Sequence, residues 1–259
     1  RTLVRWMLYL SPVTYLYLRH VISAPYGKLS SSGGRNNASF GPLLPARLSW
    51  AIFESPNLVW TSWCYRRRNR DLFGGDDSSP FINANSILLA LFFGHYLNRA
   101  VIYPLRMSKE SRPVPLAVAM AGMAFCTVNG YIQSQQLCQF RPSGDENISP
   151  RFLLGVALFL AGFAINVHSD GILRRLRNSG GGYRIPRGGA FEYVSCANLF
   201  GEIVEWSGFA LASWSLPATA FLIYTLSNLV PRALSQHDWY RGKFEEYPKA
   251  RKAMIPFVL

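Results

Sequence analysis

Residues 152–169 read FLLGVALFLAGFAINVHS, an apolar run without an acidic or basic residue apart from His168, in which Asn166 is the first polar side chain. About 20 apolar residues in a helix cross the hydrocarbon core of a bilayer, so this stretch predicts a transmembrane helix. Six further stretches have this length or nearly so, at 3–22, 46–64, 82–105, 114–137, 196–214 and 215–234. We therefore expect an all-α polytopic membrane protein, with seven transmembrane helices in a single domain over residues 1–259.

The composition supports this class. The 259 residues are 49% hydrophobic and only 16% charged, against about 25% charged in soluble globular chains, which excludes a disordered tail, a coiled coil or a solvated repeat. The net charge of +13 would suit a nucleic-acid binder. The basic residues are divided among the loops between apolar runs, however, so we exclude nucleic acid as a partner.

Loop charges predict an orientation. The loops at 24–45, 106–113 and 170–195 and the tail from Arg232 carry more basic residues than the loops at 65–81 and 138–151. The positive-inside rule then places the C-terminus in the cytosol or its topological equivalent, and the N-terminus on the far side. The four cysteines lack CxxC spacing, so we predict neither a disulfide framework nor a metal site.

Two consecutive spans carry polar side chains at helical spacing. These are Asn166, Asp170 and Arg177 on one span, and Asn198, Glu202 and Glu205 on the next. Such groups can act as interhelical hydrogen bonds that close a bundle. Because they lie beside a basic, glycine-rich loop at 180–189, we favour instead a large anionic ligand such as a dinucleotide, with arginine on phosphate. The chain has no GxGxxG after a strand, so such a pocket would not be of the Rossmann kind.

A second group lies in the N-terminal half. Glu54 falls in the middle of an apolar span, and Tyr96 follows His95 in the next. A carboxyl in such surroundings can stay protonated, and with a phenol it would direct two donors at one carbonyl oxygen. In the alternative interpretation, Glu54 pairs with Arg99 or Arg47 and Tyr96 is packing. The residues alone do not decide between the two.

Ordered motifs over nearly the whole chain resemble the steroid 5α-reductase (3-oxo-5α-steroid 4-dehydrogenase) family. They are Leu44-Pro45-Ala46-Arg47 with Glu54, His95-Tyr96 with Arg99, Ala124-Phe125-Cys126-Thr127 with Asn129-Gly130, Asn166-Val167-His168-Ser169-Asp170, Tyr183-Arg184-Ile185-Pro186, Ala197-Asn198 with Gly201-Glu202, and Tyr247-Pro248-Lys249 with Arg251.

The resemblance implies a seven-helix enzyme whose helices enclose NADPH and a lipid-like enone in one cavity. Helices of about 1–110 would hold the substrate, and helices and cytosolic loops of about 111–259 would hold NADPH. The resemblance gives the cofactor candidates as Asn166, Asp170, Arg177, Tyr183, Asn198, Glu202, Arg232, Tyr240 and Arg251. Glu54 and Tyr96 match the catalytic pair at the ketone oxygen, while Tyr26, Phe53 and Arg99 fall at the substrate site.

One departure concerns the substrate. Phe53 stands where the family has glutamine, which removes an amide from the expected substrate site. We expect reduction of the C4–C5 double bond of a 3-oxo-4-ene steroid. The alternatives are a reductase of a polyprenol-type or enoyl thioester lipid, or a non-catalytic membrane subunit of a larger assembly. We expect the endoplasmic reticulum membrane, with a mitochondrial or other organellar membrane as the alternative.

Overall fold

The structure, a computed structural model, describes residues 1–21, 40–73, 83–109, 111–139, 148–180 and 182–259, without the side chains of 68–73. The main helices are α1 (Thr2–Leu16), α2 (Ala46–Phe73), α3 (Ala84–Leu97), α5 (Leu116–Gln139), α6 (Pro150–Asn178), α7 (Ala197–Ser213) and α8 (Leu216–Lys243). Shorter segments are η1 (Tyr17–Val21), η4 (Asn98–Ile102), α4 (Tyr103–Arg106) and η5 (Gly189–Glu192). Two-residue strands β1 (Leu43–Leu44) and β2 (Val114–Pro115) pair antiparallel, Leu43 opposite Pro115.

Each of the seven predicted spans coincides with helix in the described residues. Among the described residues, three helical stretches are long and apolar enough to cross a membrane: Ala84–Arg106, which joins α3, η4 and α4, then Leu116–Gln139 and Pro150–Asn178. The prediction of an all-α membrane protein therefore holds at this coarser level. Membrane crossing by α1, α2, α7 and α8 remains a prediction.

Local sequence signals explain where the helices begin. Ser149 caps α6 by accepting a hydrogen bond from the Phe152 backbone N–H, with Pro150 in the first turn. Ser215 caps α8 in the same way through the N–H of Ala218. These side chains satisfy backbone donors that the first turn of a helix leaves open. The two caps set the ends of α6 and α8 on one side of the bundle.

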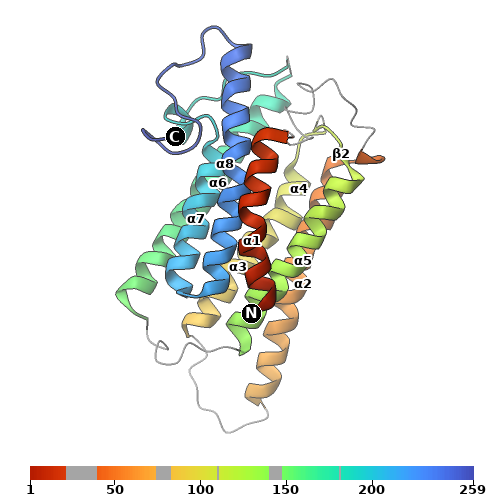
Figure 1. Ribbon diagram of the computed structural model, residues 1–259, viewed down its shortest axis with the longest axis vertical. Coiled ribbons are helices and arrows are strands. Elements are labelled where there is room, and N and C mark those ends of the chain that lie inside the picture. The colour runs from red at the N-terminus through yellow and green to blue at the C-terminus, as the bar shows by residue number, and fades with distance from the viewer. Residues whose placement is uncertain (22–39, 74–82, 110, 140–147, 181) are drawn as a thin grey trace.

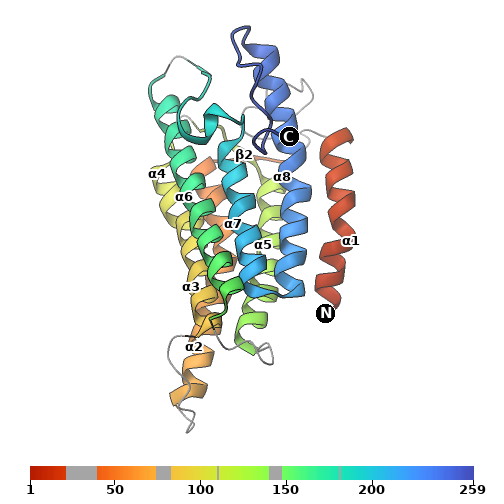
Figure 2. The same ribbon diagram turned by 90° about the vertical axis from the view of Figure 1, so that its left-hand side faces the viewer.

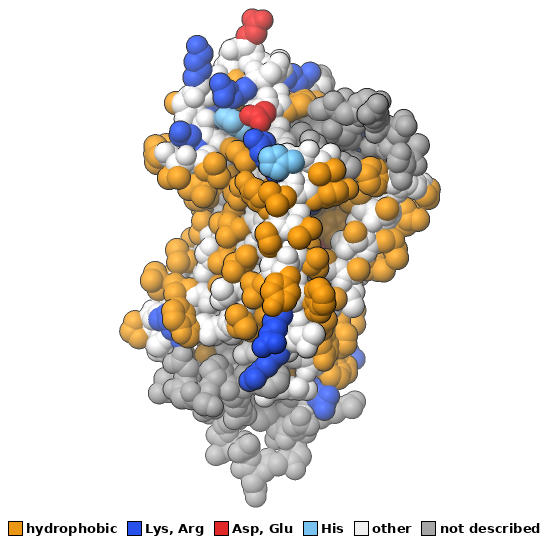
Figure 3. Space-filling view, in the orientation of Figure 1, with side chains coloured by type: hydrophobic (Ala, Val, Ile, Leu, Met, Phe, Trp, Pro, Cys, Tyr) orange, Lys and Arg blue, Asp and Glu red, His pale blue; other side chains and the backbone are white. Residues whose placement is uncertain are grey.

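Successive helices run in alternating directions, and α1 stands beside α8 at the edge of the bundle (Figures 1 and 2). Apolar side chains cover the middle of the face in Figure 3, whereas lysine and arginine lie toward its two ends. On α1 the outward face is apolar, with Trp6, Tyr9 and Val13 all more than half exposed. This distribution fits a bundle whose middle faces lipid.

The backbones of α6 and α7 are in direct contact, and glycine makes this possible. A Cβ added at Gly201 would lie 2.5 Å from the backbone nitrogen of Asn166, and one at Gly162 would overlap the backbone of Glu205. Small residues at such a crossing let two backbones touch. As a result, the polar faces of α6 and α7 are held against each other.

Contrary to the sequence-based prediction, Cys64 of α2 and Cys138 of α5 form a disulfide, with Cα atoms 6.1 Å apart. The two cysteines are 74 residues apart in sequence, and neither belongs to a short motif, so spacing gave no signal. The helix packing places them together, because α2 and α5 run side by side and end at the same end of the bundle (Figure 1).

Candidate active site

A cavity of about 630 Å³ lies inside the bundle, within the range of about 300–1,000 Å³ usual for small-molecule sites. Predicted site residues that line it are Phe53, Glu54, Tyr96, Arg99, Asp170, Arg177, Tyr183, Asn198, Glu202, Arg232 and Tyr240. Residues 100 or more positions apart in sequence thus meet around one space. Tyr26 lies outside the described residues.

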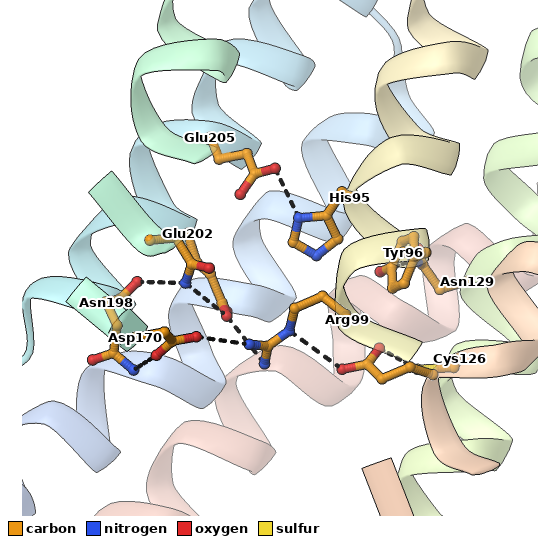
Figure 4. A network of polar contacts seen from close by, with 11 residues as sticks. His95, Tyr96, Arg99, Cys126, Asn129, Asp170, Asn198, Glu202 and Glu205 are labelled. Atoms are coloured by element: carbon orange, nitrogen blue, oxygen red, sulfur yellow. Dashed lines mark hydrogen bonds and ion pairs between the residues drawn. The ribbon is translucent and has the colours of Figure 1, made fainter. Parts of the chain in front are cut away.

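Arg99 is the centre of the polar network (Figure 4). Its guanidinium nitrogens lie 3.8 Å from Glu54, 3.4 Å from Asp170 and 3.3 Å from Glu202. It also stacks on Trp50, 4.4 Å from the ring centroid. One buried arginine therefore joins the carboxyl group of Glu54 on α2 to the carboxylates of α6 and α7. It bridges the two predicted halves of the site instead of belonging to the substrate half alone.

The local fold at Arg99 is unusual. The chain changes there from α3 into the π-helical segment η4, over Asn98–Ile102. Single π-helical turns within α-helices are often found at functional sites, because the wider turn redirects side chains.

The Glu54–Arg99 pair of the alternative interpretation of Glu54 is present, with the two groups 3.8 Å apart. Arg47 instead donates to the Met107 carbonyl oxygen, at 2.6 Å.

The α6–α7 pair presents a set of linked amides and carboxylates. Asn166 is fully buried and donates to the Asn198 carbonyl oxygen at 3.0 Å and to Glu202 Oε1 at 3.4 Å. Asn198 in turn donates to Asp170 Oδ1 at 3.1 Å. Asn166 is absent from the cavity lining, so it holds Asn198 and Glu202 from behind.

His95 and Glu205 form a second buried pair. Glu205 belongs to the polar set that the helical spacing predicted, whereas His95 was not predicted as its partner. His95 Nδ1 lies 2.7 Å from Glu205 Oε1, and the two side chains are 5% and 0% exposed. The other ring nitrogen of His95 turns away from Glu205 toward the side where Arg99 lies (Figure 4). His95 lines the cavity and Glu205 does not.

Tyr96 and Glu54 face the same cavity from α3 and α2. Asn129 of α5 donates to the Tyr96 hydroxyl oxygen, at 3.4 Å. Cys126 of α5 donates to Glu54 Oε2, at 3.6 Å. Phe53 lines the cavity beside them, with its ring 4.8 Å from that of Trp50.

Basic side chains gather at or beyond the ends of α4 and α6, and on α8. Those that line the cavity there are Arg106, Arg112, Arg174, Arg177, Arg184 and Arg232. Arg177 donates to the Ser111 hydroxyl at 3.2 Å, and Arg112 lies 5.6 Å from the ring centroid of Tyr183. This end of the cavity has the donor chemistry that binds phosphate.

The C-terminal tail holds this end together. Arg251 is 2% exposed, donates to the Pro186 carbonyl oxygen at 2.9 Å and pairs with Glu192 at 3.7 Å. It is absent from the cavity lining and supports the 184–192 loop.

Ser195, just before α7, joins the tail to α8. Its hydroxyl lies 2.6 Å from both His237 Nδ1 and the Tyr247 hydroxyl. His237 lies beyond the span predicted at 215–234, and burial, followed by the nearby Arg241, lowers its pKa. A neutral His237 therefore suits this contact.

Within the described residues, no group of three or more His, Cys, Asp or Glu could hold a metal ion. The cavity lining combines basic side chains at one end with apolar side chains such as Phe53, Phe125 and Phe221.

Comparison with known proteins supports the family resemblance. A family model described as 3-oxo-5-alpha-steroid 4-dehydrogenase matches residues 112–259. The chain is 44% identical over 254 residues to 3-oxo-5-alpha-steroid 4-dehydrogenase 1 of Bos taurus, covering 96% of this chain and 93% of that protein.

Two further relatives agree. The chain is 46% identical over 240 residues to 3-oxo-5-alpha-steroid 4-dehydrogenase 1 of Rattus norvegicus, covering 92% and 87% of the two chains. It is 38% identical over 261 residues to steroid 5-alpha-reductase DET2 of Arabidopsis thaliana, covering 97% and 94%. The resemblance and the expectation of an enzyme are confirmed: the chain belongs to the 3-oxo-5-alpha-steroid 4-dehydrogenase family and is an oxidoreductase of that type.

Proposed function

We propose that this protein reduces the C4–C5 double bond of a 3-oxo-4-ene steroid with NADPH. The observation that carries the proposal is that one cavity is lined by Glu54 and Tyr96, by the Asp170–Asn198–Glu202 set, and by arginines at one end. The names of the relatives supply the substrate class for those proteins.

The donor set of the cavity fits a dinucleotide phosphate. Arg177, Arg232 and the tyrosines Tyr183 and Tyr240 would hold the phosphates and the sugar, because arginine forks and phenols suit those groups. Asn198 and Glu202, near Arg99, would hold the polar end of the nicotinamide. NADPH, when bound, supplies a hydride.

The protein's part in the reaction is to polarise and orient the enone. Donors from Tyr96 and a protonated Glu54 at the ketone oxygen would draw electron density from the β-carbon of the double bond, where the hydride is accepted. The same two donors would stabilise the enolate until its α-carbon takes a proton. Apolar walls such as Phe53, Phe125 and Phe221 would exclude water from the ring system.

The predicted division near residue 110 needs one adjustment within this proposal. Cys126 and Asn129 of α5 contact Glu54 and Tyr96, so α5 belongs with the substrate side although it follows residue 110.

We further propose that the protein works in the endoplasmic reticulum membrane. Locating the protein in subcellular fractions would test this.

The test is turnover by purified protein with NADPH and a 3-oxo-4-ene steroid. Glu54→Gln and Tyr96→Phe should each lower kcat about 10²-fold or more, the loss seen when one oxyanion donor is removed. The exposed Glu245→Gln and Tyr131→Phe make the same chemical changes outside the cavity and should retain activity. Full activity in both site variants would reject the mechanism.

Substrate class is tested in parallel. Because Phe53 replaces the family glutamine, the same protein should be offered a polyprenol-type ketone and an enoyl thioester. Faster turnover of either one than of the steroid would keep the cofactor and replace the proposed substrate.

A further inference from the structure

The face of α5 that meets the site carries a row of neutral polar side chains. Cys126, Asn129 and Gln133 are three and four residues apart, and each is at most 5% exposed. A buried polar group in a membrane helix costs free energy unless it is hydrogen bonded. These three residues are therefore expected to make specific contacts.

The contacts form a chain from α8 to the site. Gln133 Nε2 donates to the Pro217 carbonyl oxygen at 3.0 Å and to Asn129 Oδ1 at 3.3 Å. Asn129 Nδ2 then donates to the Tyr96 hydroxyl oxygen at 3.4 Å. Among the described residues, the Tyr96 hydroxyl makes no other hydrogen bond.

This series of hydrogen bonds fixes the direction of each donor, starting from the Pro217 carbonyl oxygen. A backbone carbonyl can only accept, so the amide nitrogen of Gln133, not its oxygen, must face it. The second proton on that nitrogen then requires the oxygen of Asn129. The Asn129 amide is therefore oriented with its nitrogen toward Tyr96.

The last link determines what Tyr96 can do. An amide nitrogen donates only, so the phenol oxygen accepts from Asn129 and its own proton must point elsewhere. Tyr96 is 4% exposed and lines the cavity. The free direction for the proton is into that cavity.

We propose that Asn129 and Gln133 are positioning residues that make the Tyr96 hydroxyl a hydrogen-bond donor into the cavity. The catalytic consequence rests on the proposed function: a tyrosine oriented in this way presents its proton to the ketone oxygen. Cys126, on the same face of α5, reaches the other member of the pair through Glu54 Oε2. One helix thus supports both proposed donors.

The first test is a double-mutant cycle. Asn129→Asp keeps the shape of the side chain but offers Tyr96 an acceptor, so the phenol proton turns away from the cavity. We expect kcat to fall about 10²-fold, as for Tyr96→Phe, and to fall no further when both changes are combined. An Asn129→Asp loss that is just as large in the Tyr96→Phe background would overturn the proposal, because it would show a purely structural role.

Two further variants guard against general damage. Asn57→Asp makes the same change at a fully buried position on α2 that has no hydrogen bond to Tyr96, so its loss should add to that of Tyr96→Phe. Gln133→Met adds no buried charge and keeps the volume, and it removes both the donor that orients Asn129 and the donor that fixes the Gln133 amide on the Pro217 carbonyl oxygen. The Gln133→Met variant should lose less kcat than Asn129→Asp, and this loss should also vanish in the Tyr96→Phe background. A loss of kcat that persists there would count against the proposed series of hydrogen bonds.

The second test does not need turnover. The C–O stretching band of labelled tyrosine reports whether a phenol donates or accepts, and subtracting the Tyr96→Phe spectrum isolates Tyr96. Asn129→Asp should shift this band, and an unshifted band would overturn the positioning proposal. A shifted band in a protein that reduces no enone would instead reject only the proposed function.

Discussion

The α6–α7 pair and the α2–α5 pair both hold polar groups against the cavity, but with different side chains and different helix contacts. Each pair presents polar side chains to the cavity, but α6–α7 carries three carboxylates, the fully buried Glu205 and the mostly buried Asp170 and Glu202, and its backbones touch through glycine. The α2–α5 pair presents Glu54 and otherwise neutral groups to the cavity, and a disulfide joins Cys64 of α2 to Cys138 near the end of α5. Buried charges need accurate partners, since an imperfect pair does not recover its desolvation cost. The charged pair is the one with the tighter backbone contact: a Cβ at Gly162 would overlap the Glu205 backbone nitrogen, whereas one at Gly130 of α5 would lie 3.0 Å from the Asn57 Cα of α2.

The largest effect should come from separating α6 and α7. Gly162→Leu would place a side chain where the backbone of Glu205 lies, and backbone cannot move aside as a flexible side chain can. We expect a cost above the about 1–3 kcal/mol usual for overpacking, and little folded protein. Gly94→Leu on α3 is the matched control, because a Cβ there meets nothing within 4 Å. Yield and thermal unfolding in detergent measure both, and a Gly162→Leu protein as stable as Gly94→Leu would refute the role of the contact.

Much of α6–α7 could be predicted from the sequence. The apolar period and the spacing of Asn166, Asp170, Asn198 and Glu202 already indicated two polar faces on neighbouring helices. These residues interact over one or two helical turns, so local spacing carries the information. The contact of Asn166 with Glu202 confirms that the faces meet.

The α2–α5 region was less predictable, because its contacts depend on how distant helices pack. No spacing or motif pairs Cys64 with Cys138, or Asn129 with Tyr96. The role of Arg99 as a bridge between α2, α6 and α7 was likewise hidden, since its three carboxylates come from three helices. Such contacts follow from tertiary structure, which no periodicity in one helix reports.

The next largest effect should come from breaking the buried pair that links α3 to α7. Glu205→Leu leaves His95 buried without its partner, and loss of one member of a buried pair typically costs about 3–5 kcal/mol. Replacing both residues, as in His95→Phe with Glu205→Leu, should recover much of the stability, because no polar group is then left unpaired. Thermal unfolding of the two single variants and the double variant measures this. A double variant that is less stable than either single variant would show that His95 and Glu205 stabilise the fold through contacts other than the one with each other.

The smallest effect is expected where α2 and α5 are joined. Removing a disulfide typically costs about 2–4 kcal/mol, through the unfolded state, and a helical unfolded state in detergent should bring the loss to the lower end. Cys138→Ser should therefore lower Tm modestly, and Cys196→Ser, at a buried thiol outside the disulfide, should not. A reductant should lower the Tm of the wild type and leave Cys138→Ser unchanged; equal shifts in both would show that the bond does not form.

The same bond tests the orientation that the loop charges predict. Cys64 and Cys138 lie in α2 and α5 toward the end of the bundle that carries the loops predicted at 65–81 and 138–151, although α2 continues to Phe73. The positive-inside rule places this end away from the cytosol, and disulfides persist where the compartment is oxidising. A membrane-impermeant thiol reagent added to sealed vesicles with the cytosolic face outward should therefore fail to label Cys64 and Cys138 after reduction, and should label them once the vesicles are opened. Labelling before opening would reverse the orientation and, with it, place the arginine-lined end of the cavity on the side opposite the cytosol.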